Sequence, residues 1–251
     1  QRQAWKQRFR PQEGFKASDG DPAKLGQVPQ TIPADFALKW GEWCGEEGVK
    51  GKFSLVPFPA GVARVDRGFP DHPRREYEAW MAAYRQVITP NFDLTCELLT
   101  HTHVVDLANW RLTAVWEQYE WVDPPLEALV DYLTAAMTLV RETGLPCEGV
   151  TSPGAFGSRQ ETAYARATLE AALRVDNNPR PFYFLHVSDA PEVPDIPIWQ
   201  VDEAQGRAVA SIVGCTHDWF GGWTGYDAGD PDLFLTEDLQ GGRLAGVLAH
   251  E

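Results

Sequence analysis

Five short segments of this chain end in a histidine, an aspartate or a pair of the two. They are GFKASDGD with Asp19 and Asp21, ELLTH at 97–101, FYFLH ending at His186, ASIVGCTHD with His217 and Asp218, and AGVLAH ending at His250. Helical patterns or long loops separate these apolar runs, as is typical of strands in an alternating β/α fold. Loops after the carboxyl ends of such strands build the active site, so we expect these polar residues to converge in one cleft.

The order of the elements predicts an α/β protein with about seven strands and four helices. The strands are expected near 14–18, 50–59, 93–101, 149–153, 181–187, 207–214 and 243–250, and the helices near 34–48, 73–88, 125–142 and 158–174. Such alternation favours a parallel sheet that is either closed as a barrel or left open. We expect an N-terminal arm at 1–13 and one domain over 14–251, which is incomplete if the strand-like run before Glu251 is not its last element.

The charge balance restricts the partners. Lys and Arg number 22 against 36 Asp and Glu, which gives a formal charge of −14. Binding to nucleic acid needs a basic stripe that displaces counterions, so no nucleic-acid partner is expected. No stretch approaches the roughly 18 apolar residues of a membrane span, so no membrane partner is expected either. The sequence indicates neither the compartment nor the oligomeric state.

The four cysteines, Cys44, Cys96, Cys147 and Cys215, are scattered without C-x-x-C spacing. This spacing favours buried free thiols over metal binding or redox chemistry. A disulfide is the alternative if the protein is exported.

His101 and His103 form an H-x-H motif directly after an apolar run. On extended backbone, residues i and i+2 point to the same face, so both imidazoles can reach one ion. Imidazole is a common zinc ligand, and a carboxylate completes or orients the set; Asp106, Asp19 and Asp21 are available. The alternative interpretation is a pair of surface or hydrogen-bonded histidines.

The other strand-terminal histidines have two interpretations each. His186 is a candidate general acid, because an ordinary pKa of about 6.5 is easily tuned, or else a hydrogen-bonded core residue. His217, Asp218 and Trp219 combine a polar pair with an aromatic ring, which suits a sugar, or else form a loop held by tryptophans. His250 follows the last strand and is expected at the same mouth of the barrel.

The segment SPGAFG at 152–157 follows a strand and precedes a helix. Its glycines could bring backbone N–H groups and a helix N-terminus to an oxyanion, with Ser152 and Phe156 contacting the substrate. The alternative is a plain capping turn with Ser158 as the N-cap.

Together these segments resemble the polysaccharide deacetylase family of metal-dependent carbohydrate esterases. The similar stretches are GFKASDGDP, the helix and strand over 32–57, THTHVVD, TSPGAFG and FYFLHVSD, in the order of the family's motifs over residues 14–190. The resemblance implies a distorted (β/α)7 barrel of parallel strands and a carbohydrate substrate.

The same resemblance implies a site and a reaction. A divalent ion, with zinc as the first expectation, would bind Asp21, His101 and His103 and polarise a water and the acyl carbonyl. Asp19 would accept the proton from that water, and His186 would donate one to the leaving amine or alcohol. The implied activity is removal of an acyl group from a sugar.

The chain departs from the family pattern at three places. Gly20 separates the aspartates that are adjacent in the family, Val105 stands where the second metal histidine is expected, and TSPGAFG lacks an arginine. We therefore interpret the chain as a remote relative.

Three other functions are compatible with the sequence. A glycoside hydrolase on a related barrel needs two carboxylates, for which Asp19, Glu97, Asp106, Asp189 and Asp218 are candidates. A non-catalytic saccharide-binding relative fits the missing motif residues and the ten tryptophans. A metal amidohydrolase also suits an H-x-H motif, although its motif would lie on the first strand.

Overall fold

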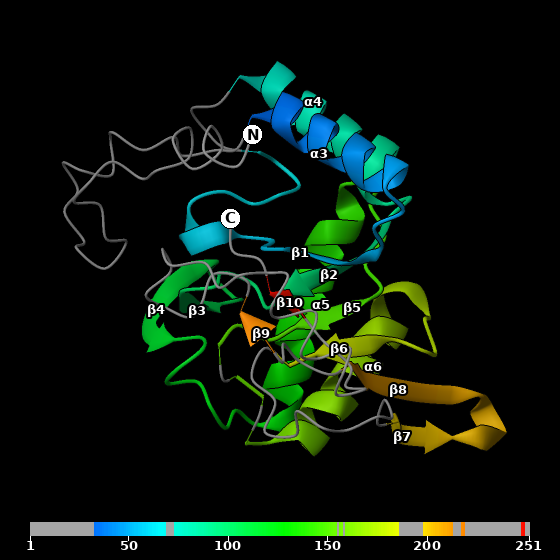
Figure 1. Cartoon of the computed structure of the whole chain (residues 1–251). Coiled ribbons are helices and arrows are strands. Elements are labelled where there is room, and N and C mark those ends of the chain that lie inside the picture. The colour runs from blue at the N-terminus through cyan, green and yellow to red at the C-terminus, as the bar shows by residue number, and fades with distance from the viewer. Residues whose placement is uncertain are drawn as a thin grey trace.

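The computed structural model describes residues 33–68, 73–154, 156–157, 159–185, 198–212, 217–218 and 247–248. In this part of the chain, helices pack on a mostly parallel sheet, so the predicted α/β class is confirmed (Figure 1). None of the helices in the described ranges combines the length and apolarity needed to cross a bilayer.

The main sheet has six strands in the order β1-β2-β5-β6-β8-β7. They are β1 (Gly51–Leu55), β2 (Phe92–Glu97), β5 (Gly149–Thr151), β6 (Phe182–Phe184), β8 (Arg207–Ile212) and β7 (Ile198–Asp202). The first five are parallel, as expected, and β7 pairs antiparallel with β8. Within the described strands the sheet has two edges, β1 and β7, and does not close into a barrel.

The four expected helices are present. They are α3 (Ala34–Glu46), α4 (Arg74–Ala83), which continues as the π-turn η3 (Tyr84–Ile88), α5 (Leu126–Glu142) and α6 (Glu161–Asp176). Helix α5 ends before Gly144, whose φ of +80° suits glycine. Helix α6 begins at Glu161 with Gln160 as N-cap residue, so the expectation that Ser158 caps it is wrong.

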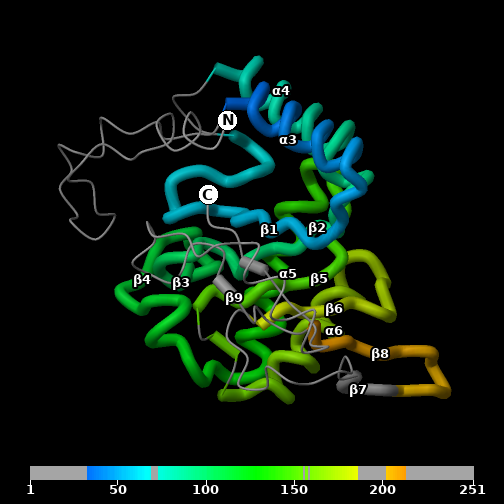
Figure 2. The backbone as a smooth tube through the Cα atoms, viewed as in Figure 1, coloured from blue at the N-terminus to red at the C-terminus, as the bar shows by residue number. Residues whose placement is uncertain are grey.

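Three features lie outside the predicted alternation. The segment between β2 and α5 forms a hairpin of β3 (His103–Asp106) and β4 (Arg111–Trp116). A second hairpin joins β7 to β8 through η4 (Glu203–Gln205), and Figure 2 shows its turn extending beyond the rest of the sheet. Strands β9 (His217–Asp218) and β10 (Val247–Leu248) form a separate parallel pair. A short 3₁₀ turn, η2 (Pro59–Gly61), follows β1.

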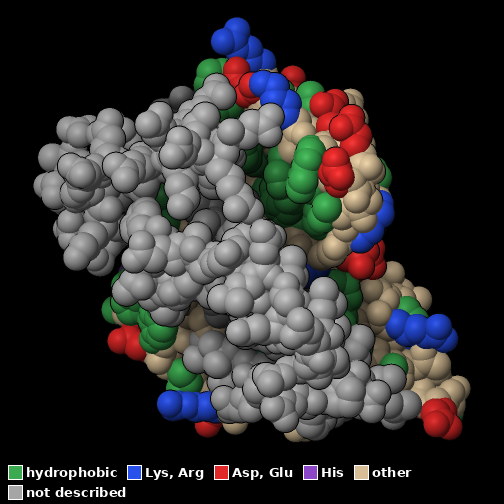
Figure 3. Space-filling view, viewed as in Figure 1, with side chains coloured by type: hydrophobic (Ala, Val, Ile, Leu, Met, Phe, Trp, Pro, Cys, Tyr) green, Lys and Arg blue, Asp and Glu red, His purple; other side chains and the backbone are tan. Residues whose placement is uncertain are grey.

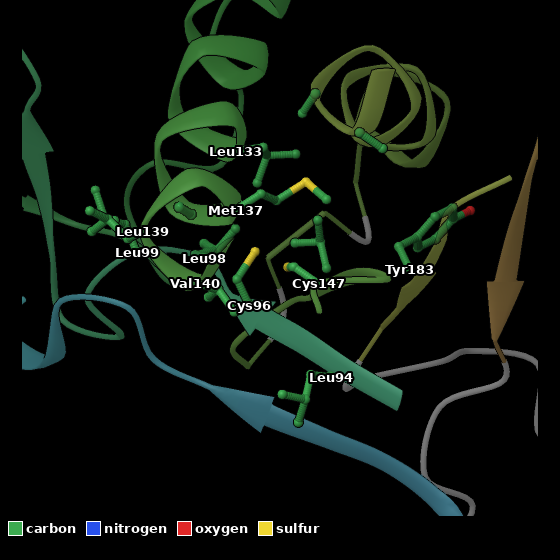
Figure 4. Close-up of a cluster of buried hydrophobic side chains, with 14 of the residues drawn as sticks. Leu94, Cys96, Leu98, Leu99, Leu133, Met137, Leu139, Val140, Cys147 and Tyr183 are labelled. Carbon is green, nitrogen blue, oxygen red and sulfur yellow. The ribbon is translucent and has the colours of Figure 1, made fainter. Parts of the chain in front are cut away.

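The core lies between one face of the sheet and the helices. Alternate residues of the strands point to this face, among them Phe53, Leu94, Cys96, Val150 and Tyr183. Figure 4 shows Leu133, Met137 and Val140 of α5 lying over Cys96 and Cys147. The cysteines Cys44, Cys96 and Cys147 are buried free thiols, as expected, and Cys215 lies outside the described residues.

Strand β5 approaches β6 closely at Gly149. A Cβ at this position would meet the carbonyl oxygen of Phe182. Only glycine therefore allows β5 to keep its place at the centre of the sheet.

Candidate active site

The face of the sheet opposite the helices carries polar side chains. Along β1 and β2 the polar residues recur with the period of two that a strand requires, as in Lys52 and Ser54 or Thr95 and Glu97. The parallel register places Ser54 beside Thr95, and Glu97 beside Thr151 of β5. Five polar residues from three strands therefore share one surface, which we call the polar face.

An ammonium group lies among hydroxyls on the polar face. Lys52 Nζ donates to Ser54 Oγ and, at 3.0 Å, to Thr151 Oγ1. Thr151 Oγ1 also lies 3.1 Å from Ser54 Oγ and 2.7 Å from Thr95 Oγ1. The same ammonium stands 4.4 Å from the centre of the Phe184 ring, a cation–π distance. The arrangement places a positive charge near the register partner of Glu97.

An acid/base pair stands at the carboxyl end of β2. Glu97 Oε1 lies 3.0 Å from His101 Nε2, and the two side chains are 18% and 45% exposed. The hydrogen bond that the His101 ring donates to Glu97 raises the pKa of His101, while burial opposes this by disfavouring the charged ring. The pair therefore favours an imidazolium that is held in place and still reaches solvent.

Glu117 holds the turn that carries His101. This carboxylate is fully buried at the end of β4. Its Oε1 accepts from the backbone N–H groups of Leu99 and Thr100 at 3.3 and 2.9 Å, and its Oε2 accepts from that of His101 at 2.6 Å. The hydroxyl of Tyr132 on α5 donates to Oε1 at 2.5 Å. The Glu117 carboxylate thus connects the β3–β4 hairpin to α5 and to the turn that carries His101.

Burial gives Glu117 and Tyr132 unusual titration properties. Burial raises the pKa of Glu117, and the hydrogen bonds from Tyr132 and the backbone partly offset the shift. Burial, and then the charge of Glu117, raise the pKa of Tyr132, which keeps its hydroxyl a donor. The same oxygen accepts from Val105 N–H at 3.1 Å, so Tyr132 also fixes β3.

The geometric basis of the expected H-x-H pair is wrong. His101 is not extended, because its φ is +62° and it lies in the turn after β2. His103 begins β3, and its ring lies 4.5 Å from that of Trp116. The two imidazoles have different partners, and the described residues contain no group of three His, Cys, Asp or Glu side chains placed to hold a metal ion.

Asp106, a candidate carboxylate, has a local role. It accepts from Ala108 N–H and from the Asn109 amide at 3.0 and 2.7 Å. These bonds lower the pKa of Asp106, with the Asn109 bond the larger cause. The residue therefore closes the turn between β3 and β4.

Two predicted substrate contacts lie within the interior. Ser152 is buried, and its Oγ donates to the Phe184 carbonyl at 3.3 Å. Phe156 is 1% exposed, with Trp121 stacked at 5.9 Å and Tyr164 edge-on at 5.7 Å between ring centres. The ring of Phe156 is thus a core residue here, and the loop precedes α6 by three residues instead of leading directly into it.

The remaining predicted residues are not tested. Asp19, Asp21, His186, Trp219 and His250 lie outside the described residues. For His217 and Asp218 only the backbone is described, in β9, where they pair with Val247 and Leu248. Their roles stay predictions.

Sequence reasoning missed most of the polar face. The alternation in KGKFS and DLTCE was a sufficient signal for Lys52, Ser54 and Thr95. No local pattern marks Glu117, because three of its four partners are backbone groups 16 to 18 residues away and the fourth is Tyr132 on α5.

Comparison of the chain with models of known protein families, with curated proteins and with solved structures finds no match. The resemblance to polysaccharide deacetylases therefore stays a prediction.

The Glu97–His101 pair leads to a prediction about titration. Glu97→Gln is expected to lower the pKa of His101, because a neutral amide stabilises the imidazolium less than a carboxylate does. An NMR titration of the imidazole signals measures this, with His101→Gln used for assignment. Asp106→Asn is the control, since that carboxylate binds its own turn. An unchanged titration in Glu97→Gln would contradict the pairing.

The same pair predicts how stability depends on pH. Because the pKa of His101 is raised in the folded state, the pair contributes fully to the free energy of unfolding below the ordinary histidine pKa of about 6.5. This contribution is lost as the pH rises through the raised pKa. The stability difference between the wild type and Glu97→Gln should therefore be larger at pH 5.5 than at pH 8.5. Urea unfolding at these two pH values measures it, and a difference that grows with pH would contradict the assignment.

Proposed function

We propose that this protein is a metal-dependent hydrolase that removes acyl groups from a carbohydrate, with the polar face as its active site. The observation that carries the proposal is the Glu97–His101 pair, 3.0 Å apart at the carboxyl end of a central parallel strand. In parallel α/β folds this end of the strands is where catalytic groups gather. The proposal includes a distorted (β/α)7 barrel, whose further strands would add at the edges β1 and β7 and enclose the polar face.

The described side chains suit acyl transfer to water. In this reaction the water oxygen adds to the acyl carbonyl carbon, and the bond from that carbon to the sugar nitrogen or oxygen breaks. The water loses a proton, for which Asp19 is the expected acceptor, and the leaving atom takes one, which the His101 imidazolium can donate while Glu97 keeps it oriented. Lys52 contacts Thr151, the register partner of Glu97, so its positive charge lies on the same face of the sheet as the pair and would favour an acyl oxyanion formed there.

The metal is the part of the proposal that rests on the resemblance. A bound divalent ion would supply polarisation of the water and the carbonyl. The described donors fit it only in part: His101 acts here as the acid, since an imidazolium has no lone pair for an ion, and the His103 ring lies against Trp116. Asp21, the third expected ligand, is outside the described residues.

The direct test is acetate release from acetylated xylan and from N-acetylated chitin oligosaccharides. We expect release by the wild-type protein at neutral pH. Cleavage of glycosidic bonds without acetate release would instead favour the glycoside hydrolase. Binding of these sugars without any turnover would favour the saccharide-binding relative.

Metal removal provides a separate prediction. Dialysis against EDTA is expected to lower the rate of acetate release at least about tenfold, with zinc restoring it, because the water loses its polarising ion. Elemental analysis of the same samples relates the rate to the bound metal. Full activity in metal-free protein would contradict the metal dependence and assign the reaction to the side chains alone.

The described residues offer little support for the alternative function, a glycoside hydrolase with two catalytic carboxylates. Glu97 is paired with His101, Asp106 closes its turn, and Glu117 is fully enclosed by donors. A glycosidase needs two carboxylates facing each other across the bond that is cleaved. The side chains of its other three candidates are not described, so the deacetylase-like reaction is the one we propose.

A further inference from the structure

The hairpin beside the candidate site exposes aromatic side chains. Of the eight large apolar side chains exposed in the described residues, four lie on β4 and the turn after it: Leu112, Val115, Trp116 and Tyr119. Figure 3 shows hydrophobic side chains at the surface in this region. Trp116 and Tyr119 are 40% and 59% exposed, and their ring centres are 6.4 Å apart with planes inclined at 45°. Exposed apolar clusters of this kind commonly mark ligand-binding surfaces.

The two rings are attached to a well-braced backbone. Trp116 N–H donates to Glu120 Oε2 at 2.9 Å, and the Trp116 carbonyl accepts from Glu120 and Trp121 N–H at 3.1 and 3.0 Å. The His103 ring, on the strand partner of Trp116, lies 4.5 Å from the Trp116 ring. Because the backbone is already fixed, binding of a ligand to these rings requires little loss of backbone conformational entropy.

This surface is directly connected to the Glu97–His101 pair. Glu117 follows Trp116 in sequence, and its carboxylate accepts from His101 N–H at 2.6 Å. Its own N–H donates to the Thr102 carbonyl at 2.7 Å. The carboxylate that holds the His101 turn therefore belongs to the residue directly after Trp116 of the aromatic surface.

We propose that Trp116 and Tyr119 form a saccharide subsite that stacks a neutral pyranose ring of the substrate. This inference rests on the proposed function, because it places a second sugar of an oligosaccharide beside the one that reacts at Glu97–His101. The C–H faces of a pyranose are apolar and match aromatic rings, while its hydroxyls can bind neighbouring carboxylates such as Glu120. A neutral glycan also suits a protein with a formal charge of −14 better than an acidic one does.

The test is binding of N-acetyl-chitohexaose and of xylohexaose, measured by isothermal titration calorimetry. Trp116→Ala and Tyr119→Ala are each expected to weaken the binding of the recognised hexamer about tenfold. Trp116→Phe should recover much of the affinity, since it restores an aromatic face. Trp43→Ala is the matched control, because Trp43 is 52% exposed on α3 and should leave the affinity unchanged.

The outcomes separate this inference from the proposed function. Hydrolysis of p-nitrophenyl acetate, which contains no sugar to stack, should be equal in the wild type and Trp43→Ala. If the wild-type protein binds the sugar but turns over no substrate, and the variants lose this binding, the subsite stands and the hydrolase is rejected. Binding that is absent in the wild type, or unchanged in Tyr119→Ala, would overturn the subsite. Circular dichroism checks that each variant is folded. If the wild type binds no sugar but self-associates, and Tyr119→Ala abolishes this association, the rings serve contact between copies and the subsite is overturned.

Discussion

Glu117→Ala is expected to lower the free energy of unfolding by about 3–5 kcal/mol, a large effect for one side chain at the end of a hairpin. The carboxylate is fully buried and accepts four hydrogen bonds, from Leu99, Thr100, His101 and Tyr132. Alanine would leave three backbone donors and one hydroxyl without their acceptor, and removal of a buried charge offsets part of that cost. Urea unfolding followed by circular dichroism measures the loss.

Glu117→Gln tests the two carboxylate oxygens separately, because it keeps one oxygen as an acceptor and replaces the other by an NH₂ group. Its amide oxygen can keep the three bonds to Oε1, but its amide nitrogen would face the His101 N–H, donor against donor. We expect a loss of about 1–2 kcal/mol and a displaced His101 turn. Glu120→Ala is the matched control, because that carboxylate is exposed and accepts a single bond from Trp116 N–H. Equal stability of Glu117→Ala and Glu120→Ala would contradict the role given to Glu117.

His101→Ala is expected to reduce the rate of acyl release by about 10²–10⁴-fold while the protein stays folded. The side chain is 45% exposed, so its removal leaves little cavity and costs little stability. The loss is in catalysis, because no other described side chain pairs with Glu97 to donate a proton. Initial rates on the acetylated oligosaccharide and a thermal melt together measure the effect.

His103→Ala distinguishes the acid/base pair from a metal ligand set. If His101 acts with Glu97, His103→Ala should lower the rate far less, because the His103 ring lies against Trp116. Equal loss of activity and of bound zinc in both variants would show that the two histidines share an ion. Unchanged activity in His101→Ala would remove the observation that carries the proposed function.

Much of the fold could be predicted because its signals are local. The helices α3, α4 and α5 lie within a few residues of their expected ranges, since amphipathic spacing and terminal glycine or proline mark them. The hairpin β3–β4 was not predicted, because β3 has only four residues and β4 is exposed along almost its whole length, so it has no buried face to mark it. The barrel that the resemblance implies stays a prediction, because closure depends on how the edges β1 and β7 of the described sheet are completed and not on the patterns of these strands.

The sequence by itself determined the alternating α/β class, the parallel strands and the position of polar residues at strand ends, because periodicity and apolar runs are properties of contiguous residues. Only the tertiary structure decided which polar groups meet. A φ of +62° at His101 turns its ring to Glu97 and away from His103, and Glu117 fixes that turn through backbone donors remote in sequence. Hydrogen bonds to backbone carry no residue signature, so only their geometry reveals them.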